Sequence, residues 1–359
     1  MQSYAWRAAG IVCLIAAFVA GFALVAGAFG ILITQAGLFD HDTPISKPRK
    51  AAEQRANVVF VGPSHVATGV IPEVFDEELS RFVKVQSYNM AIAGLTIPET
   101  EAALARLFAM KPCCVTYVIF YPGFMMTDVA RVPTTRSVEF FTLPRALQFW
   151  SFLSEYKPPP DLSQVDFAKN IIIATFQHYT NLGLGLPLLG VVETWYDRPQ
   201  PALGDRWSAR GHIAIDRAVP DGEAKTWWLD EISKLKAAGP QFQAPIISDR
   251  LFANVERIIT LINAHGARAI VVRPPSLARW GYDVAFVRKY EQACSDGPPL
   301  LDFNPDAYPT LYEGRNHYDG AHLNVRGAEI WSRILADEVG ELIRSGRLDH
   351  PSVCRAAGQ

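Results

Sequence analysis

The sequence predicts an α/β protein in which helices cover a parallel sheet. Two observations support this: short apolar runs alternate with segments of helical periodicity, and the alternation occurs twice, over residues 57–121 and again over residues 251–344. The 359 residues, 49% of them hydrophobic, suffice for one large domain with a buried core, so a disordered or fibrous protein is excluded. In such folds, active sites form at the carboxyl ends of the strands.

The predicted elements follow in order along the chain. A β-branched run that ends in Gly-Pro begins the domain, and glycine or proline residues stop several later elements. We expect strands at residues 57–62, 83–88, 115–121, 269–272 and 300–303, and helices at residues 97–110, 251–265, 284–294 and 325–344. The domain is therefore expected over residues 57–345, with a tail over residues 346–359.

The N-terminal segment predicts a membrane anchor over residues 1–39. Residues 8–39 contain no charged side chain, and residues 11–33 are long enough to span about 30 Å of hydrocarbon. A cleaved signal peptide is the alternative, because the small residues Ala26, Gly27 and Ala28 resemble a cleavage site. The apolar run exceeds the usual h-region of about 7 to 15 residues, which favours an uncleaved transmembrane helix.

A juxtamembrane linker is expected over residues 40–56, and its charges bear on orientation. Only Arg7 precedes the span, whereas four basic residues follow it: Lys47, Arg49, Lys50 and Arg55. The positive-inside rule then favours a cytoplasmic domain, which conflicts with the function expected below, so the orientation stays open.

Residues 122–244 lack the strand–helix rhythm and form an expected insertion, rich in proline and aromatic residues such as Phe140, Trp150 and Trp195. The segment is too long for a plain loop, so helices of its own are expected, and it can shape or cover the site. The alternative is that its aromatic residues form a satellite core.

Composition excludes several classes of function. The formal net charge is −2 and no long basic run is present, so nucleic acid is not an expected partner. The five cysteines include no metal-ligand spacing such as C-x-x-C, so no metal site is expected. A disulfide scaffold is not expected either, although Cys294 and Cys354 can pair in an oxidising compartment.

Ser64 is the candidate nucleophile. It comes two residues after the first predicted strand, in Val-Val-Phe-Val-Gly-Pro-Ser-His, where a chain leaving a parallel sheet turns toward a helix. A serine hydroxyl needs a positioned base, and a helix N-terminus is suited to stabilising an oxyanion. The alternative is an ordinary helix N-cap. The motif is not the G-x-S-x-G elbow, because Val66 replaces its second glycine.

Asp319 and His322 are the candidate general-base pair, in Tyr-Asp-Gly-Ala-His-Leu-Asn just before the last predicted helix. A turn over three residues can bring the two side chains together, so that Asp319 orients His322 and His322 accepts the serine proton. The alternative is that both are loop and capping residues. The other histidines considered have no comparable partner spacing: His65, His178, His212, His265 and His317. They are expected to be structural or exposed, with substrate contact weighed only for His65.

Together these motifs resemble those of the SGNH, or GDSL-like, hydrolase superfamily over residues 57–340: Gly62-x-Ser64, Gly94 after the second strand, and the D-x-x-H of Asp319 and His322. The strings Gly-Pro-Ser-His-Val and His-Leu-Asn-x-x-Gly-Ala are similar to those of membrane-anchored members that act in O-acylation of alginate, cellulose and teichoic acid. The resemblance implies a flavodoxin-like three-layer sandwich, an acyl-serine intermediate, and no metal or organic cofactor.

The resemblance also implies three oxyanion donors: the Ser64 backbone N–H, Gly94, and an asparagine side chain after the third strand. That asparagine is missing, because Tyr121-Pro122-Gly123-Phe124-Met125 replaces the expected G-x-N-D. Asn89 is a candidate substitute, with a turn residue as the alternative. Arg273, which ends the fourth strand, is expected either to bind an anionic substrate or to pair with an acid.

The expected function is that of a membrane-anchored serine esterase or O-acyltransferase, with acetyl as the expected acyl group. Its partners would be an acyl ester or an extracytoplasmic carbohydrate polymer, the inner (cytoplasmic) membrane and a polymer-export or acyl-transfer membrane complex. One alternative is a polysaccharide-binding or assembly subunit with the same fold and weak or no activity, because the oxyanion hole departs from the family pattern. Another is an esterase acting on lipids.

Overall fold

The structure is a computed structural model, and it describes residues 2–35, 46–122, 140–151, 163–180, 208–216, 247, 249–276, 280–350 and 354. The chain divides into two compact units. One contains Met1–Thr43 and Thr127–Gln200, and the other contains Pro44–Met126 and Pro201–Gln359. Each is described by itself.

The larger unit is an α/β domain around a five-stranded, all-parallel sheet with strand order β2-β1-β3-β4-β5. Its strands are β1 Val58–Val61, β2 Ser87–Asn89, β3 Tyr117–Phe120, β4 Arg268–Arg273 and β5 Leu300–Asp302. Its helices are α2 Ser46–Glu53, α3 Ser64–Gly69, α4 Pro72–Leu79, α5 Ile97–Ala109, α11 Asp249–Ala264, α12 Trp280–Ala293 and α13 Val325–Arg344, with 3₁₀ turns at Pro309–Tyr312 and Gly314–Asn316. The predicted parallel α/β sheet is confirmed.

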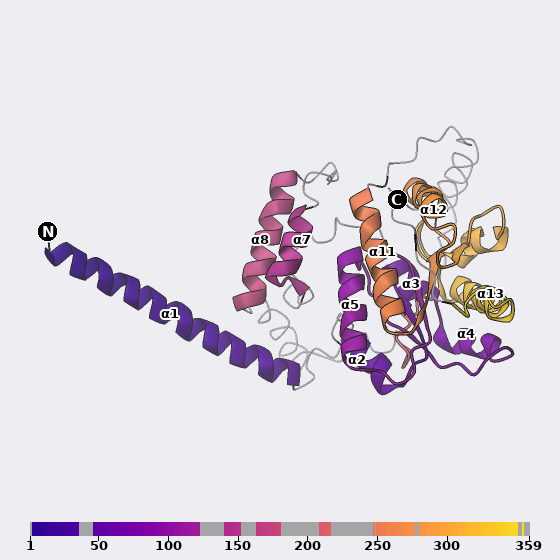
Figure 1. The fold of residues 1–359 in the computed structure, drawn as a ribbon, viewed down its shortest axis with the longest axis horizontal. Helices are drawn as coiled ribbons and strands as arrows, with labels where there is room; N and C mark the ends of the chain where they lie inside the picture. Colours follow the sequence, from indigo (N-terminus) through magenta and orange to yellow (C-terminus); the bar gives the residue numbers. More distant parts are fainter. Residues whose placement is uncertain are drawn as a thin grey trace. The chain divides into compact units, whose positions relative to one another are not determined.

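Successive side chains of each strand point to opposite faces of the sheet, and both faces are apolar. In β1, Val59 and Val61 pack in one core with α5, α11 and α12, whereas Val58 and Phe60 pack in a second core with α3, α4 and α13. Helices therefore cover both faces. Figure 1 shows α5 beside α11 and α4 beside α13, in agreement with their contacts.

Helix α3 lies close against α13, and a glycine permits this approach. A Cβ added at Gly69 would lie 2.5 Å from a ring atom of Trp331, which is fully buried in α13. Asn324 caps the start of α13, where its side chain accepts the Gly327 N–H at 3.0 Å. The packing of α3 on α13 thus brings the end of β1 close to the loop that precedes α13.

The structure corrects the expected linker over residues 40–56. Ser46–Glu53 forms helix α2, whose Lys47 is fully buried in the α/β unit. The Lys47 Nζ donates to the carbonyl oxygens of Asn89 at 3.2 Å, Ala91 at 2.5 Å and Gly211 at 3.0 Å. Part of the predicted linker is therefore bound to the end of β2.

The expected insertion over residues 122–244 is likewise not one separate element. Its described residues 208–216 lie within the α/β unit, where the Asn89 N–H donates to the Arg210 carbonyl at 2.8 Å and the Ile213 N–H donates to the Ala67 carbonyl at 2.9 Å. Arg210 also forms an ion pair with Asp76. These residues therefore join β2 to helices α3 and α4. Trp195, Trp207, Trp227 and Trp228 lie outside the described residues.

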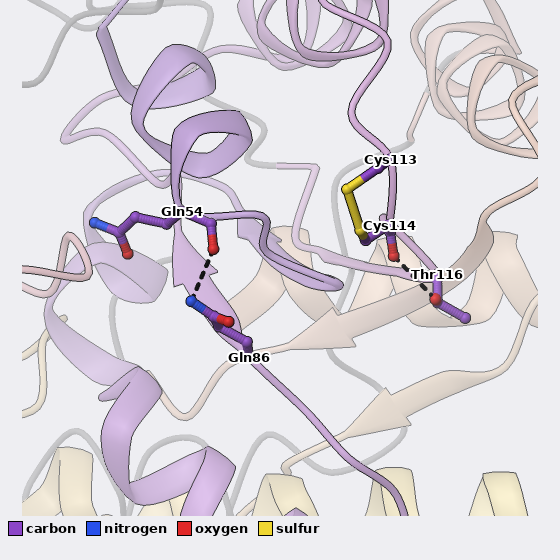
Figure 2. Close-up of a disulfide and its surroundings, with 5 residues drawn as sticks. All are labelled: Gln54, Gln86, Cys113, Cys114 and Thr116. Carbon is purple, nitrogen blue, oxygen red and sulfur yellow. Dashed lines mark hydrogen bonds between the residues drawn. A yellow bond between two sulfur atoms is a disulfide. The ribbon is translucent and has the colours of Figure 1, made fainter.

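Two disulfides occur in this unit. Cys294, at the end of α12, pairs with Cys354 across 60 residues, and Cys113 pairs with its neighbour Cys114. Figure 2 shows the second bridge beside Thr116, whose hydroxyl donates to the Cys114 carbonyl at 3.1 Å. The same figure shows the Gln86 side chain donating to the Gln54 carbonyl. The pairing of Cys294 with Cys354, which the sequence left open, occurs because packing brings the two residues to a Cα separation of 4.2 Å.

The smaller unit contains α1 Gln2–Gln35, α7 Leu143–Ser151 and α8 Gln164–Thr180. Within α1, Gly10–Ala28 is long and apolar enough to cross a membrane. Helices α7 and α8 lie in the expected insertion, and Phe140, Phe141 and Phe149 pack together there with ring centroids 5.2 to 5.8 Å apart. These three aromatic residues form a satellite core, as the alternative reading of the insertion expected.

Candidate active site

Ser64 lies at the carboxyl end of β1, where it is the first residue of α3. Gly62 keeps the connection short: a Cβ at this position would lie 2.8 Å from a methyl group of Val66 and 3.1 Å from the Tyr121 carbonyl oxygen. The chain therefore passes close to the end of β3 as it turns into the helix. The N–H groups of a first helical turn have no partner inside the helix, so the Ser64 N–H is available at this edge.

The structure brings the three predicted catalytic residues together. The Ser64 hydroxyl lies 2.6 Å from His322 Nε2, and His322 Nδ1 lies 3.0 Å from both carboxylate oxygens of Asp319. An ionised carboxylate can only accept hydrogen bonds, so Nδ1 carries the ring proton and Nε2 accepts the serine hydroxyl. This is the hydrogen-bonded order of a nucleophile, a general base and an orienting carboxylate.

Asp319 is held in its charged form. Burial alone would raise the pKa of its carboxyl group, but the hydrogen bond and charge interaction with His322 outweigh it and lower the pKa. The N–H groups of Ala321 and His322 also donate to Asp319 Oδ1, at 2.7 Å and 2.8 Å. The Asp319 carboxylate thus has two roles: it closes the turn and it orients the His322 ring.

Residues before and after this turn fix its position. His317 and Leu323 form an antiparallel bridge, and the Tyr318 N–H donates to the His322 carbonyl at 3.2 Å. His317 is fully buried, and its Nε2 lies 2.7 Å from the Leu311 carbonyl, to which it donates. These contacts therefore fix the position of the turn that carries His322.

Two aromatic rings flank the His322 imidazole. The His65 ring stacks on it with centroids 5.0 Å apart and an interplanar angle of 26°, and the Tyr318 ring stacks with centroids 5.2 Å apart and an angle of 11°. Tyr318 was not a predicted site residue, because no spacing rule predicts a ring contact between residues four apart in a loop. His65 contacts the base, whereas substrate contact was the role weighed for it.

Tyr121 and Asp283 form a buried polar pair beside His65. The Tyr121 hydroxyl donates to Asp283 Oδ1 at 2.5 Å, and the Tyr121 ring meets the His65 ring edge-on with centroids 5.9 Å apart. Tyr121 directly follows β3 and Asp283 lies in α12. The pair links the end of β3, through His65, to the ring of His322. Neither residue was a predicted site residue, because their sequence separation hides the contact.

Asn89 does not supply the missing oxyanion donor. It is fully buried at the end of β2, and its side-chain amide donates to the Val66 and Val70 carbonyls, both at 2.9 Å, while its oxygen accepts the Ala91 N–H at 3.0 Å. Both amide hydrogens are therefore used. Asn89 holds the turn after β2 against α3, which agrees with the alternative of a turn residue.

Arg273 pairs with an acid, as one of its two expected roles predicts. It is buried at the end of β4 and forms an ion pair with Asp302, the residue opposite it on β5. Strand β3 separates β4 from β1, the strand that Ser64 follows. The ion pair thus joins the ends of β4 and β5.

The remaining oxyanion positions are only partly described. Gly94 lies in a turn with φ 68°, two residues after Ile92, whose N–H donates to the Gly62 carbonyl at 3.0 Å. The turn therefore leaves the same edge of the sheet as Ser64, and its positive φ favours glycine. Gly123, Phe124 and Met125, which replace the expected asparagine motif, lie outside the described residues.

The other histidines have structural or surface positions. Burial lowers the pKa of His212 and of His317 to about 4, and the Nε2 of His212 donates to the Thr68 carbonyl at 3.1 Å. His265 is exposed and stacks on Phe108. In the described part of the chain, no group of three or more His, Cys, Asp or Glu side chains is placed to hold a metal ion.

A comparison with protein-family models and with curated protein sequences finds no match for this chain. The class of protein therefore rests on the fold and the site: a parallel α/β protein with a serine, a histidine and an aspartate in hydrogen-bonded order at the carboxyl end of its sheet.

Proposed function

We propose that the protein is a membrane-anchored serine acyl hydrolase or O-acyltransferase that works through an acyl-serine intermediate. The observation that carries the proposal is the distance of 2.6 Å between Ser64 Oγ and His322 Nε2, with Nδ1 of the same ring on Asp319. A serine that only caps a helix, or a histidine that only stabilises a loop, would not require hydrogen bonds that connect Ser64, His322 and Asp319 in this order.

The chemistry follows from the positions of the protons. His322 Nε2 takes the Ser64 proton as Oγ attacks the acyl carbon, and Asp319 stabilises the imidazolium that forms. The imidazolium then donates its proton to the leaving oxygen, which leaves an acyl ester on Ser64. Water or a sugar hydroxyl next attacks this ester, His322 accepts its proton, and Ser64 is regenerated. Water as acceptor gives an esterase, and a sugar hydroxyl gives a transferase.

The oxyanion would be stabilised by the Ser64 N–H at the start of α3 and by the Gly94 turn at the same sheet edge. Removing one oxyanion donor typically costs about 10²- to 10³-fold in rate. Because Asn89 has no amide hydrogen to offer, a site with two donors would be slow unless residues after Pro122 or the substrate supply a third.

Membership of the SGNH superfamily and a flavodoxin-like fold are part of the proposal. The strand order β2-β1-β3-β4-β5 is that of flavodoxin-like proteins, in which ligands bind where the order reverses, between β1 and β3. Ser64 follows β1 and Tyr121 follows β3, so the candidate site lies at this position.

We propose an extracytoplasmic domain, an acetyl group and a carbohydrate polymer as substrate, with a polymer-export or acyl-transfer complex as partner. The pairing of Cys294 with Cys354 supports the compartment, because disulfides persist where thiols are oxidised. The basic residues after α1 favour the opposite orientation, with a cytoplasmic domain. We give the disulfide more weight than these residues, because single spans do not always obey the positive-inside rule. The polymer and the acyl group rest on the motif resemblance.

A second candidate is a binding or assembly subunit with little activity. The observation that favours it is the lack of a third oxyanion donor among the described residues, since the Asn89 amide is committed to Val66 and Val70. In this case the fold would be kept while turnover is lost.

Purified full-length protein in detergent, offered p-nitrophenyl acetate, separates the two candidates. Turnover that Ser64→Ala lowers by about 10⁴-fold or more supports the enzyme. Ser80→Ala is the matched control, because its hydroxyl is bonded to the Glu77 carbonyl at the end of α4. If neither p-nitrophenyl acetate nor longer esters are turned over, and a fluorophosphonate does not label Ser64, the binding role is favoured. A preference for long acyl chains would instead indicate a lipid substrate.

A further inference from the structure

Helices α7 and α8 form an antiparallel hairpin in the smaller unit. The N–H of Leu143, at the start of α7, donates to the Tyr179 hydroxyl near the end of α8 at 3.0 Å. One face of each helix packs against the other helix. Its buried side chains are Ala146 and Phe149 from α7 and Phe167, Ile171 and Ala174 from α8. The hairpin thus already has a small core of its own.

A second face of the hairpin is apolar and exposed. On α8 the residues Val165, Ile172, Phe176 and Tyr179 recur at the spacing of one helical stripe, and on α7 Leu143, Leu147 and Trp150 do the same. Their exposed fractions run from 45% at Trp150 to 75% at Val165. A groove of about 390 Å³ runs between the two stripes, with Ile171 and Ala146 also in its lining. Monomeric soluble proteins rarely expose a continuous apolar patch of this kind.

The same compact unit contains the segment that is long and apolar enough to cross a membrane. Gly10–Ala28 meets that criterion within α1, and α1 contacts α8. Where α1 spans a bilayer, its contact with α8 holds the hairpin close to the membrane. The exposed stripe then lies close to lipid.

The composition of the stripe suits the interface between water and hydrocarbon. Trp150 and Tyr179 combine an apolar ring with a polar tip, which is the pattern of membrane-interface residues. Lys169 lies on the same face of α8 as Val165 and Ile172 and is exposed, so its ammonium can reach the headgroups while its stem stays in apolar surroundings. At nine residues α7 is too short to span the bilayer, whereas an amphipathic helix of this kind suits the membrane surface.

We propose that the α7–α8 hairpin inserts its Leu147, Ile172 and Phe176 side chains into the surface of the bilayer beside α1, as a second membrane contact of this protein. The occupant of the groove is the acyl-chain region of lipid. The inference rests on α1 as a membrane span and is independent of the chemistry proposed for Ser64.

Site-directed spin labelling of the full-length protein in phosphatidylcholine–phosphatidylglycerol vesicles tests the proposal. A nitroxide is attached in turn at Leu147→Cys, Ile172→Cys and Phe176→Cys, in a Cys13→Ser background and without reductant so that the paired cysteines stay blocked. Lys84→Cys, an exposed position of the α/β unit, is the control. We measure collision with oxygen, which partitions into lipid, and with a water-soluble nickel chelate.

The expected result is a depth of about 5–10 Å below the phosphate level at all three hairpin positions, with the control exposed to the nickel chelate. Nickel accessibility at the hairpin equal to that of the control would overturn the proposal, because the face would then lie in water. Labels that are immobilised and shielded from both reagents would also overturn it, because a protein would then cover the groove.

Discussion

The imidazole of His65 stacks on the imidazole of His322, with the ring centroids 5.0 Å apart, although the two residues lie far apart along the chain. His65 directly follows Ser64 in α3, so the helix that carries the hydroxyl also supports the ring that would take its proton. The packing of Gly69 on Trp331 holds α3 against α13, and this contact keeps the two rings together.

We expect the ring of His65, more than its charge, to matter for turnover. His65→Phe keeps a flat ring beside His322 and should retain most of the activity on p-nitrophenyl acetate. His65→Ala removes the support, and a misplaced base lowers kcat by up to about 10²-fold. Equal losses in the two variants would contradict a packing role. Circular dichroism of both variants checks that the fold is kept.

Asp319→Asn should lower kcat by about 10³- to 10⁴-fold with little change in KM. An amide can donate to Nδ1, which favours the wrong tautomer, and it cannot stabilise the imidazolium. Asp306→Asn, an exposed change in the loop after β5, is the control. Activity of Asp319→Asn close to that of the native protein would remove the carboxylate from the mechanism.

Asn89→Ala should lower the free energy of unfolding by about 2–4 kcal/mol. The change leaves the buried Val70 carbonyl without its donor and the Ala91 N–H without its acceptor, and each unsatisfied group costs about 1–3 kcal/mol. Urea unfolding followed by circular dichroism measures this. Unchanged stability with a loss of kcat of about 10²-fold would return Asn89 to the role of an oxyanion donor.

The free energy of unfolding should fall as the pH is lowered from 6.5 to 4. In the folded protein the pKa of His212 and of His317 is lowered to about 4 by burial, from an ordinary value of 6.5. The unfolded chain therefore binds protons in this window that the folded chain does not, so stability is complete above pH 6.5 and is lost toward pH 4.

Urea midpoints at pH 7.5, 6 and 5 measure this dependence. His317→Gln, which keeps a donor for the Leu311 carbonyl, should flatten the slope of stability against pH. A slope that His317→Gln leaves unchanged would show that this ring is not the titrating group.

Replacing Cys294 and Cys354 by serine should lower the free energy of unfolding by about 4 kcal/mol. The bridge closes a loop of 60 residues, and the entropy of the unfolded chain that it removes has this magnitude. Mass spectrometry of alkylated protein, taken from cells without reduction, shows whether the pair forms. Free thiols at both positions would contradict an oxidising compartment and, with it, the proposed orientation of the domain.

The sequence by itself determined the fold class, the apolar N-terminal helix and the order of the candidate residues. These follow from local periodicity and from position relative to strand ends: Ser64 comes just after an apolar run, and Asp319 and His322 are three residues apart before a helix. A parallel sheet gathers the carboxyl ends of its strands at one edge, so strand order was not needed to expect that these residues would meet.

Only the tertiary structure decided which polar groups are free to act. Asn89 and Arg273 stand at strand ends as a site residue would, but packing places the Asn89 amide on two carbonyls and Arg273 on Asp302. It also brought Tyr318 and His65 onto His322, and Cys294 onto Cys354. The physical reason is that hydrogen bonds, stacked rings and disulfides depend on distances of a few ångströms between residues whose sequence separation carries no information about them.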